Sequence, residues 1–498
     1  MANNFPLIIS KHLWLDQLCL SFFISVSVLL IIPVLLILFT RNANKRSSSS
    51  SGRKSLNLPP SPPRLPVIGN LHQLGKFPHR SLRALSEKYG PLMLLHLGQA
   101  APTLVVSSPD LVKEIAKNHD TTFSNRPQTT ATDILFYGGK DMAFSPYGES
   151  WRQARRICAV QLLCLKRVQS FQSIREEEVT KMVERLRKAS LNIGDSTNSV
   201  NLSEILISTS NNIVSRCVLG ENYDTEEGGG SRLGELGRKA LVQFLAFSVA
   251  DFFPSLRWID VLRGFIASLK STSRALDAIY SEVIEEHKAI FTSSPKDFVD
   301  ILLQLQKDHS MVNFELTNIH IKAIIQDMLV GGIETTSTLM EWLMSELMNN
   351  PRVMKRAQEE VRRVVGEKAM VEINDIHRMD YLKCVIREAL RLHPPGTLLI
   401  PRETSRSVEI RGYHIPAGTK VLVNAWAIHR HPDFWDEPEE FIPERFENSP
   451  VDFKSQECFE LIPFGFGRRQ CPGIAFGVTS TEYVIANLLY WFDWKLPT

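Results

Sequence analysis

Near its C-terminal end the chain reads Phe464-Gly-Phe-Gly-Arg-Arg-Gln-Cys-Pro-Gly473, which sets one cysteine among glycines and arginines. Gly467 and Gly473 permit sharp turns and a close approach of the backbone, so that amide N–H groups can point at the sulfur of Cys471. A positive charge two residues away, on Arg469, offsets the charge of a thiolate. This loop therefore predicts a cysteine thiolate that faces a metal.

The remaining cysteines have no such surroundings. Seven cysteines spread over 498 residues, without any C-x-x-C pair, argue against a disulfide framework or a zinc knuckle. They favour a reducing compartment, in which a single cysteine has a chemical role. The others are predicted to be core residues: Cys19, Cys158, Cys164, Cys217, Cys384 and Cys458.

An apolar stretch near the N-terminus, from Leu18 to Phe39, contains no charged residue. As a helix it would span roughly 33 Å, which is enough to cross a bilayer. A signal peptide would have a shorter apolar core and a small-residue cleavage site, and neither is evident; a buried core helix is the other alternative. The positive-inside rule places the rest of the chain in the cytosol, because basic residues follow the stretch: Arg41, Lys45, Arg46, Arg53 and Lys54.

The chain divides into three predicted regions. Residues 1–40 form the membrane anchor, and residues 41–66 form a basic, serine-rich spacer that ends in a proline-rich hinge. No internal repeat and no second linker of this kind follows. Residues 67–498 are therefore predicted to form one domain.

The loop around Cys471 matches F-x-x-G-x-R-x-C-x-G at every fixed position, and it resembles the haem-binding loop of cytochrome P450 enzymes. The resemblance covers about residues 59–498 and is most like the plant microsomal (A-type) members. It implies the cytochrome P450 fold, mainly α with a small β part, preceded by one transmembrane helix. It also implies haem b with Cys471 as the axial ligand of the iron, and Phe464 as a shield for the sulfur.

A second match supports this resemblance. In Glu388-Ala-Leu-Arg391 the i to i+3 spacing puts both side chains on one helix face, although such pairs are usually solvated when they stand alone. With Arg445 of Pro443-Glu-Arg-Phe446 the pair resembles the Glu-Arg-Arg network of the family. That resemblance implies a role in folding and haem retention for Glu388, Arg391 and Arg445.

A third match lies in a long helix predicted from about Thr317 to Asn349 and ended by Pro351. Adjacent glycines at 331 and 332 cost a helix on the order of 2 kcal/mol, which predicts a functional reason such as local opening. The resemblance implies that Glu334 and Thr335 supply protons for the reaction with dioxygen. Alternatively, the hydroxyl of Thr335 bonds to its own helix backbone.

A fourth match, Trp151-x-x-x-Arg155, places two donors on one helix face. By resemblance, Trp151 and Arg155 donate to a haem propionate, with Arg402 and Arg469 as the remaining propionate partners. The substrate pocket is predicted to involve a loop from about 121 to 144 and five further positions: Ile324, Met328, Gly331, Leu398 and Leu399. These mostly apolar positions indicate a small apolar substrate.

The chain carries no nucleotide-binding motif of its own. A Walker loop and a G-x-G-x-x-G after a strand are both absent from the sequence, so NADPH would act through a separate NADPH-cytochrome P450 reductase. The formal net charge of only +3 means that the protein as a whole has no strong positive field that would attract nucleic acid. His429 and His431 are read as surface or packing residues, and Glu285-Glu-His287 as a solvated helix face. Membrane lipid, O₂ and the substrate complete the predicted partners.

The predicted activity is a monooxygenase reaction that inserts one oxygen atom of O₂ into a terpenoid, phenylpropanoid or alkaloid, on the endoplasmic reticulum membrane with the catalytic domain in the cytosol. The chain stops at Thr498, about thirty residues before the usual end of the family, which predicts that the C-terminal end is missing. Two alternatives stay open. One is a P450-fold isomerase or dehydratase that needs no reductase, and the other is a non-catalytic haem-binding protein.

Overall fold

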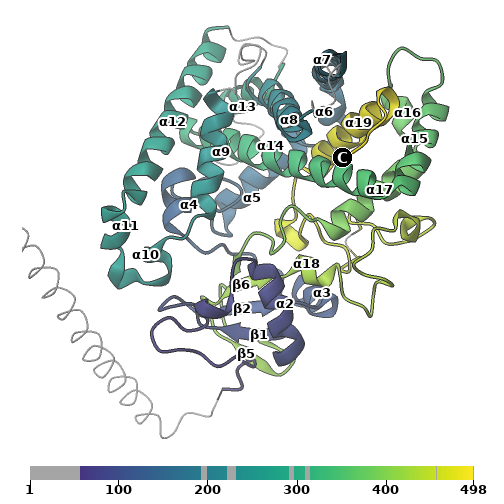
Figure 1. Ribbon diagram of the computed structural model, residues 1–498. Coiled ribbons are helices and arrows are strands. Elements are labelled where there is room, and N and C mark those ends of the chain that lie inside the picture. Colours follow the sequence, from purple (N-terminus) through teal and green to yellow (C-terminus); the bar gives the residue numbers. More distant parts are fainter. Residues whose placement is uncertain are drawn as a thin grey trace, which may run out of the picture.

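A computed structural model of the chain describes residues 56–191, 199–220, 232–290, 296–308, 315–455 and 457–496. The predicted membrane anchor lies outside these residues. Figure 1 shows a large helical part and, below it, a smaller part built around strands. The prediction of a mainly helical fold with a small β part is confirmed.

The helices account for most of the described chain. They are α2 (Pro78–Tyr89), α3 (Pro109–Asn118), α4 (Thr130–Leu135), α5 (Glu149–Arg156), α6 (Leu165–Ser170), α7 (Gln172–Leu191), α8 (Leu202–Leu219), α9 (Arg232–Leu245), α10 (Val249–Phe252), α11 (Trp258–Leu262), α12 (Phe265–Ala289), α13 (Phe298–Lys307), α14 (Asn318–Asn349), α15 (Pro351–Val365), α16 (Ile373–Ile376), α17 (Asp380–Leu392), α18 (Ala425–Ile428) and α19 (Ile474–Trp491). The predicted pocket loop at 121–144 is not irregular throughout, because α4 forms within it.

The smaller part contains a four-stranded sheet in the order β1-β2-β6-β3 and a separate two-stranded sheet. β1 (Leu92–Leu95) and β2 (Thr103–Val106) are antiparallel, and β2 runs parallel to β6 (Lys420–Val423), which also pairs with β3 (Arg402–Glu403). Strand alternation at 408–418 predicts strands, and this is confirmed by the hairpin of β4 (Val408–Ile410) and β5 (Tyr413–Ile415).

Helix α14 runs through the helical part, where it packs against α8, α17 and α19. Its start is fixed by the side chain of Thr317, which accepts a hydrogen bond from His320 N–H. The helix is unbroken at Gly331 and Gly332, so the predicted local opening is not seen. A Cβ at Gly332 would lie 3.2 Å from both methyl carbons of Val214 on α8. Close helix packing therefore accounts for the second glycine.

Candidate active site

The loop that carries Cys471 is held by the backbone and by one carboxylate. The N–H of Cys471 donates to the carbonyl of Phe464 at 2.9 Å. Gly467 has φ +62, and a Cβ there would lie 2.3 Å from Oδ1 of Asp120. That carboxylate accepts the N–H of Arg468 at 3.2 Å. Only glycine fits at position 467, and Asp120 is a loop anchor that sequence analysis missed because it lies far away in the chain.

The thiol of Cys471 is exposed even though protein surrounds the loop. Burial raises the pKa of this thiol, while the backbone N–H of Gly473 and the positive charge of Arg155 lower it. On α14, Gly331 and Thr335 are exposed as well. A Cβ at Gly477, near the start of α19, would lie 3.8 Å from Oγ1 of Thr336, so the helix that follows the loop packs on α14 next to Thr335.

Three buried arginines converge beside the loop: Arg126, Arg402 and Arg469. Each donates to backbone carbonyl oxygens. Of these three arginines, and among the described residues, only Arg402 has a carboxylate within 4 Å, that of Asp120 at 3.8 Å. Burial, together with the charge of Arg402, lowers the pKa of Arg469 to about 9. The cluster therefore carries excess positive charge in a buried place, which an anionic group would stabilise.

Arg126 was absent from the residues singled out in the sequence. Its guanidinium donates to Ala143 O at 3.0 Å and to Ile400 O at 2.7 Å. Burial lowers its pKa strongly, and the charges of Arg402 and Arg469 lower it further. The signal was present, because Arg126 is the only charged residue between Asp120 and Asp133.

Trp151 and Arg155 lie on α5 as predicted by their spacing, and both point at the segment around Met142. The indole N–H of Trp151 donates to the carbonyl of Met142 at 3.1 Å, and Nη1 of Arg155 lies 3.9 Å from the Met142 sulfur. The guanidinium of Arg469 stacks over the indole at 4.4 Å from its centroid. For Trp151 to donate to a propionate, its bond to Met142 would have to be exchanged.

The side chains of Glu334 and Thr335 take separate directions from α14. The hydroxyl of Thr335 donates to Gly331 O at 2.6 Å, which is the helix-backbone alternative named above. Oε1 of Glu334 lies 3.4 Å from Nε of Arg238 on α9. A hydroxyl bonded in this way keeps its oxygen available as an acceptor, and it must rotate before it can donate elsewhere.

Glu388, Arg391 and Arg445 meet in one buried network. The guanidinium of Arg391 donates two hydrogen bonds of 2.7 Å to the carboxylate of Glu388, and Nε of Arg445 donates to the same carboxylate at 3.1 Å. The third Arg391 nitrogen, Nη1, donates to the carbonyls of His429 and Pro438. The network thus ties α17 to the chain that leads toward the Cys471 loop.

His429 belongs to this network. It is fully buried, with Nδ1 3.1 Å from Arg391 O, and Nε2 accepts the N–H of Ile462 at 2.9 Å. Burial and the charge of Arg391 lower its pKa to about 3, so the ring is neutral. The interpretation as a packing residue holds for His429, which links Arg391 to the segment before the cysteine loop.

The predicted pocket residues fall into two groups. Ile324, Met328 and Gly331 lie along α14, where Ile324 and Met328 are buried in the large helical core. Leu398 and Leu399 pack against the two clusters around the sheet. Leu399 has φ +52, a left-handed conformation that is uncommon for a leucine and is often found at ligand sites.

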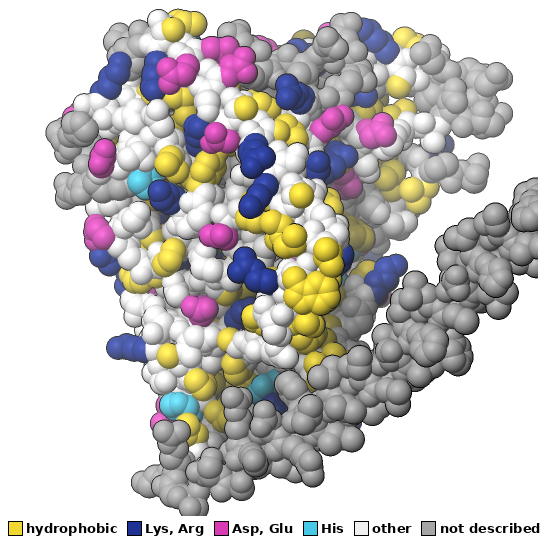
Figure 2. Space-filling model, turned by 90° about the vertical axis from the view of Figure 1, so that its left-hand side faces the viewer, with side chains coloured by type: hydrophobic (Ala, Val, Ile, Leu, Met, Phe, Trp, Pro, Cys, Tyr) yellow, Lys and Arg dark blue, Asp and Glu magenta, His cyan; other side chains and the backbone are white. Residues whose placement is uncertain are grey.

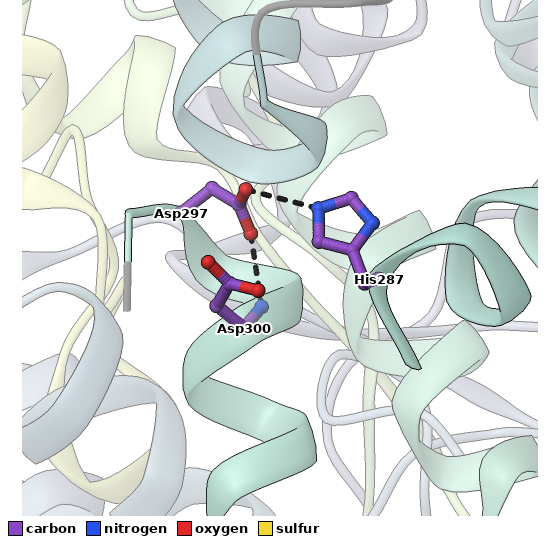
Figure 3. Close-up of side chains that lie close together, drawn as sticks. All are labelled: His287, Asp297 and Asp300. Atoms are coloured by element: carbon purple, nitrogen blue, oxygen red, sulfur yellow. Dashed lines mark hydrogen bonds and ion pairs between the residues drawn. The ribbon is translucent and has the colours of Figure 1, made fainter. Parts of the chain in front are cut away.

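A second group of metal-ligating residue types is formed by His287 of α12, Asp297 at the N-cap of α13 and Asp300 of α13 (Figure 3). His287 bonds Val283 O at 2.8 Å and Asp297 Oδ2 at 3.0 Å, and Asp297 Oδ1 accepts the N–H of Asp300. Burial would lower the pKa of His287, but Asp297 raises it to about 9. The charged ring has no lone pair for a metal, so this cluster fastens α12 to α13. Reading His287 as part of a solvated face was wrong.

The residues described above fit a haem group. An exposed thiol on a glycine-bearing loop is the donor that haem-thiolate iron requires. The buried arginine cluster, with few carboxylates nearby, matches the two propionates that such a group carries. Cys471 would hold the iron, and Arg126, Arg402 and Arg469 would hold the propionates.

Comparisons with known proteins agree. The family model for cytochrome P450 matches residues 59–498. Phenylacetaldehyde oxime monooxygenase CYP71AN24 of Prunus mume is 54% identical over 484 residues, 97% of this chain and 88% of that protein. Costunolide synthase of Cichorium intybus is 45% identical over 450 residues, 90% of this chain and 88% of that protein. A zebra fish cytochrome P450 structure with progesterone has a TM-score of 0.73 and 29% identity, covering 84% of this chain and 93% of that one.

Proposed function

Because the chain belongs to the cytochrome P450 family of haem-dependent monooxygenases, we propose that it inserts one oxygen atom of O₂ into a small apolar compound of plant specialised metabolism. The observation that carries the proposal is the exposed thiol of Cys471 beside a buried arginine cluster. One relative is named as an oxime monooxygenase and another as a costunolide synthase. The substrate class is a terpenoid, a phenylpropanoid or an alkaloid.

The chain's own residues would then divide the work. Haem, when bound, supplies the activation of dioxygen. Cys471 binds the iron, the arginines orient the group through its propionates, and Thr335 moves a proton after its hydroxyl turns away from Gly331 O. Glu334 takes part in proton supply once its pair with Arg238 opens. The Glu388 network holds the loop in place.

Electrons would reach the haem from NADPH through a reductase that docks beside α5. Exposed Arg152, Arg156 and Lys166 lie on α5 and α6, and the apolar side chains of Val160 and Leu165 are 55% and 58% exposed between them. A basic surface with apolar contacts suits an acidic partner. This is the arrangement we propose for the reductase.

One assay separates the proposed function from its two alternatives. Purified full-length protein with reductase and NADPH is expected to form one product oxygen per O₂ consumed, with oxygen label from ¹⁸O₂ in the product. Candidate substrates are first selected by the spectral shift that they cause on binding. Product without NADPH would identify an isomerase or dehydratase, and substrate binding without turnover would identify a non-catalytic haem protein.

We propose that the membrane anchor at 1–40 is assisted by a second lipid-contacting surface. In the described residues no single helix is long and apolar enough to cross a bilayer, and one bent pair, 232–252 with 254–262, meets both criteria together. Figure 2 shows hydrophobic side chains gathered on the face that bears these helices. The exposed apolar residues there are Val242, Leu245, Phe247, Leu256, Trp258, Val261 and Leu262.

The end of the hinge and the first residues of the domain extend this apolar surface. Leu65, Val67 and Ile68 are at least 37% exposed, and Ile68 O accepts the N–H of Gly98. The next residue, Gln99, donates its N–H to Phe252 O of α10. Hinge and helices therefore adjoin through one turn, and together they form a face that can rest on lipid.

Removal of residues 1–40 is expected to weaken binding to anionic vesicles without abolishing it. Trp258→Glu with Leu262→Glu in the shortened chain should then remove most of the residual binding, because each lost apolar contact is worth about 1.5–3 kcal/mol. Co-sedimentation measures the bound fraction. Leu191→Glu, at a residue 84% exposed on α7, is the control and should change little. Full vesicle binding by the shortened chain would contradict the anchor.

A further inference from the structure

Two buried carboxyl groups, Asp141 and Asp327, come together where the segment 141–145 meets α14. Asp141 is 0% exposed and Asp327 is 8% exposed. Oδ2 of Asp327 accepts the N–H of Met142 at 2.7 Å and that of Ala143 at 3.3 Å, and Oδ2 of Asp141 accepts the N–H of Phe144 at 2.8 Å. Within the described chain, no other group bonds to Oδ1 of either aspartate, and a proton on one carboxyl group supplies the side-chain hydrogen bond between the two.

Neighbouring carboxyl groups in a buried place cannot both carry a charge. Burial raises the pKa of Asp141, and burial with the negative charge of Asp141 raises the pKa of Asp327 further. Asp327 therefore keeps its proton, and Asp141 carries the charge. The groups that face the pair are Arg126, Arg469 of the cysteine loop, Cys158 after α5 and Tyr280 of α12.

The segment 141–145, whose N–H groups donate to the two aspartates, also accepts hydrogen bonds from residues of the candidate site. Its carbonyl at Met142 accepts from Trp151 Nε1 at 3.1 Å and from Arg469 Nη1 at 3.2 Å, and its carbonyl at Ala143 accepts from Arg126 Nε at 3.0 Å. The N–H groups of these residues point to the aspartates, and their C=O groups point to the arginines. A shift of the segment would move all three side chains at once.

We propose that Asp141 and Asp327 share one proton and act as a positioning pair, which sets the segment 141–145 and through it Arg126, Trp151 and Arg469 for the haem propionates. The inference rests on the proposed haem site. Neither aspartate reaches the reacting atoms. Their effect is on how long the haem is held and on how that depends on pH.

The raised pKa of the buried carboxyl groups sets the direction in which haem retention depends on pH. A carboxyl whose folded pKa is raised contributes stability that is fully present below its unfolded pKa and is lost as pH rises through the folded value. The hold on the segment should therefore weaken toward alkaline pH. Asp327→Asn offers the same acceptor and donor as the protonated acid but has no proton to lose.

The test is the rate of haem transfer from the full-length ferric protein to excess apomyoglobin between about pH 6 and pH 9. The wild-type rate is expected to rise with pH, by at most about tenfold per unit for one linked proton, and the Asp327→Asn rate to rise less steeply. Asp327→Leu, which removes the polar contacts, should release haem at least tenfold faster at about pH 6.

Equal pH slopes in wild type and Asp327→Asn would overturn the shared proton. Failure of Asp327→Asn to fold would do the same, because the amide preserves the contact pattern. Slow haem release from Asp327→Leu would overturn the positioning role. A wild-type chain that binds no haem would instead overturn the proposed site itself, and the two failures are therefore distinguishable.

Discussion

Cys471→Ala is expected to abolish the absorption band at about 450 nm that the reduced, carbon monoxide-bound wild type should show. That band reports a thiolate ligand to haem iron, and alanine leaves no sulfur at the loop. The arginine cluster is unchanged in the variant, so some haem can still enter the site. The measurement is the difference spectrum of the reduced protein with and without carbon monoxide.

The matched control is Cys458→Ala. Cys458 is half-buried and lines a pocket of about 310 Å³ between α3 and the cysteine loop. Burial raises its pKa to about 11, so it remains a thiol near neutral pH. Its variant should keep the band. A normal spectrum from Cys471→Ala, or loss of the band only in Cys458→Ala, would remove Cys471 as the ligand.

Thr335→Ala is expected to uncouple NADPH oxidation from product formation while leaving the haem spectrum intact. The substitution removes the hydroxyl and the γ-methyl group of one exposed side chain, and neither the cysteine loop nor the proposed reductase-docking surface changes. Proton transfer by a placed side chain contributes roughly 10²- to 10⁴-fold, so product per NADPH should drop steeply as hydrogen peroxide rises. Product, peroxide and NADPH are measured in one reaction.

Two companion variants locate the effect. Thr335→Ser keeps a hydroxyl on the exposed position and should restore most of the coupling. Thr336→Ala changes a buried threonine whose oxygen faces Gly477 of α19, about 100° further round the helix. It should affect packing more than coupling. Unchanged coupling in Thr335→Ala would leave its bond to Gly331 O as its whole role.

Elements marked by local signals were predictable from the sequence. The long helix predicted from about Thr317 to Asn349 is α14, because a capping threonine precedes it and an asparagine and a proline follow it. The network of Glu388 and Arg391 is likewise a contact between residues three apart, which a helix enforces. In these cases sequence distance and spatial distance agree.

Contacts between distant segments were not predictable in the same way. Asp327 is the only charged residue between Lys322 and Glu334, an anomaly in an apolar helix, but nothing in the chain names Met142 as its partner 185 positions away. The partners of Arg126 and Asp120 are also distant in the chain, so these contacts could not be predicted from the sequence either. A buried charge can be suspected from its neighbours, whereas its partner depends on the fold.

The sheet order has a consequence for how the chain is made. β2 is buried at all four positions, yet its parallel neighbour β6 begins at Lys420, opposite Thr103. At roughly 5–20 residues per second, β2 leaves the ribosome about 15 to 60 s before β6 exists. The hairpin of β1 and β2 must pass that interval with an apolar, unpaired edge. Until β3 and β6 are translated, that edge is open to pairing with other chains, and these late strands complete the sheet that the first ones began.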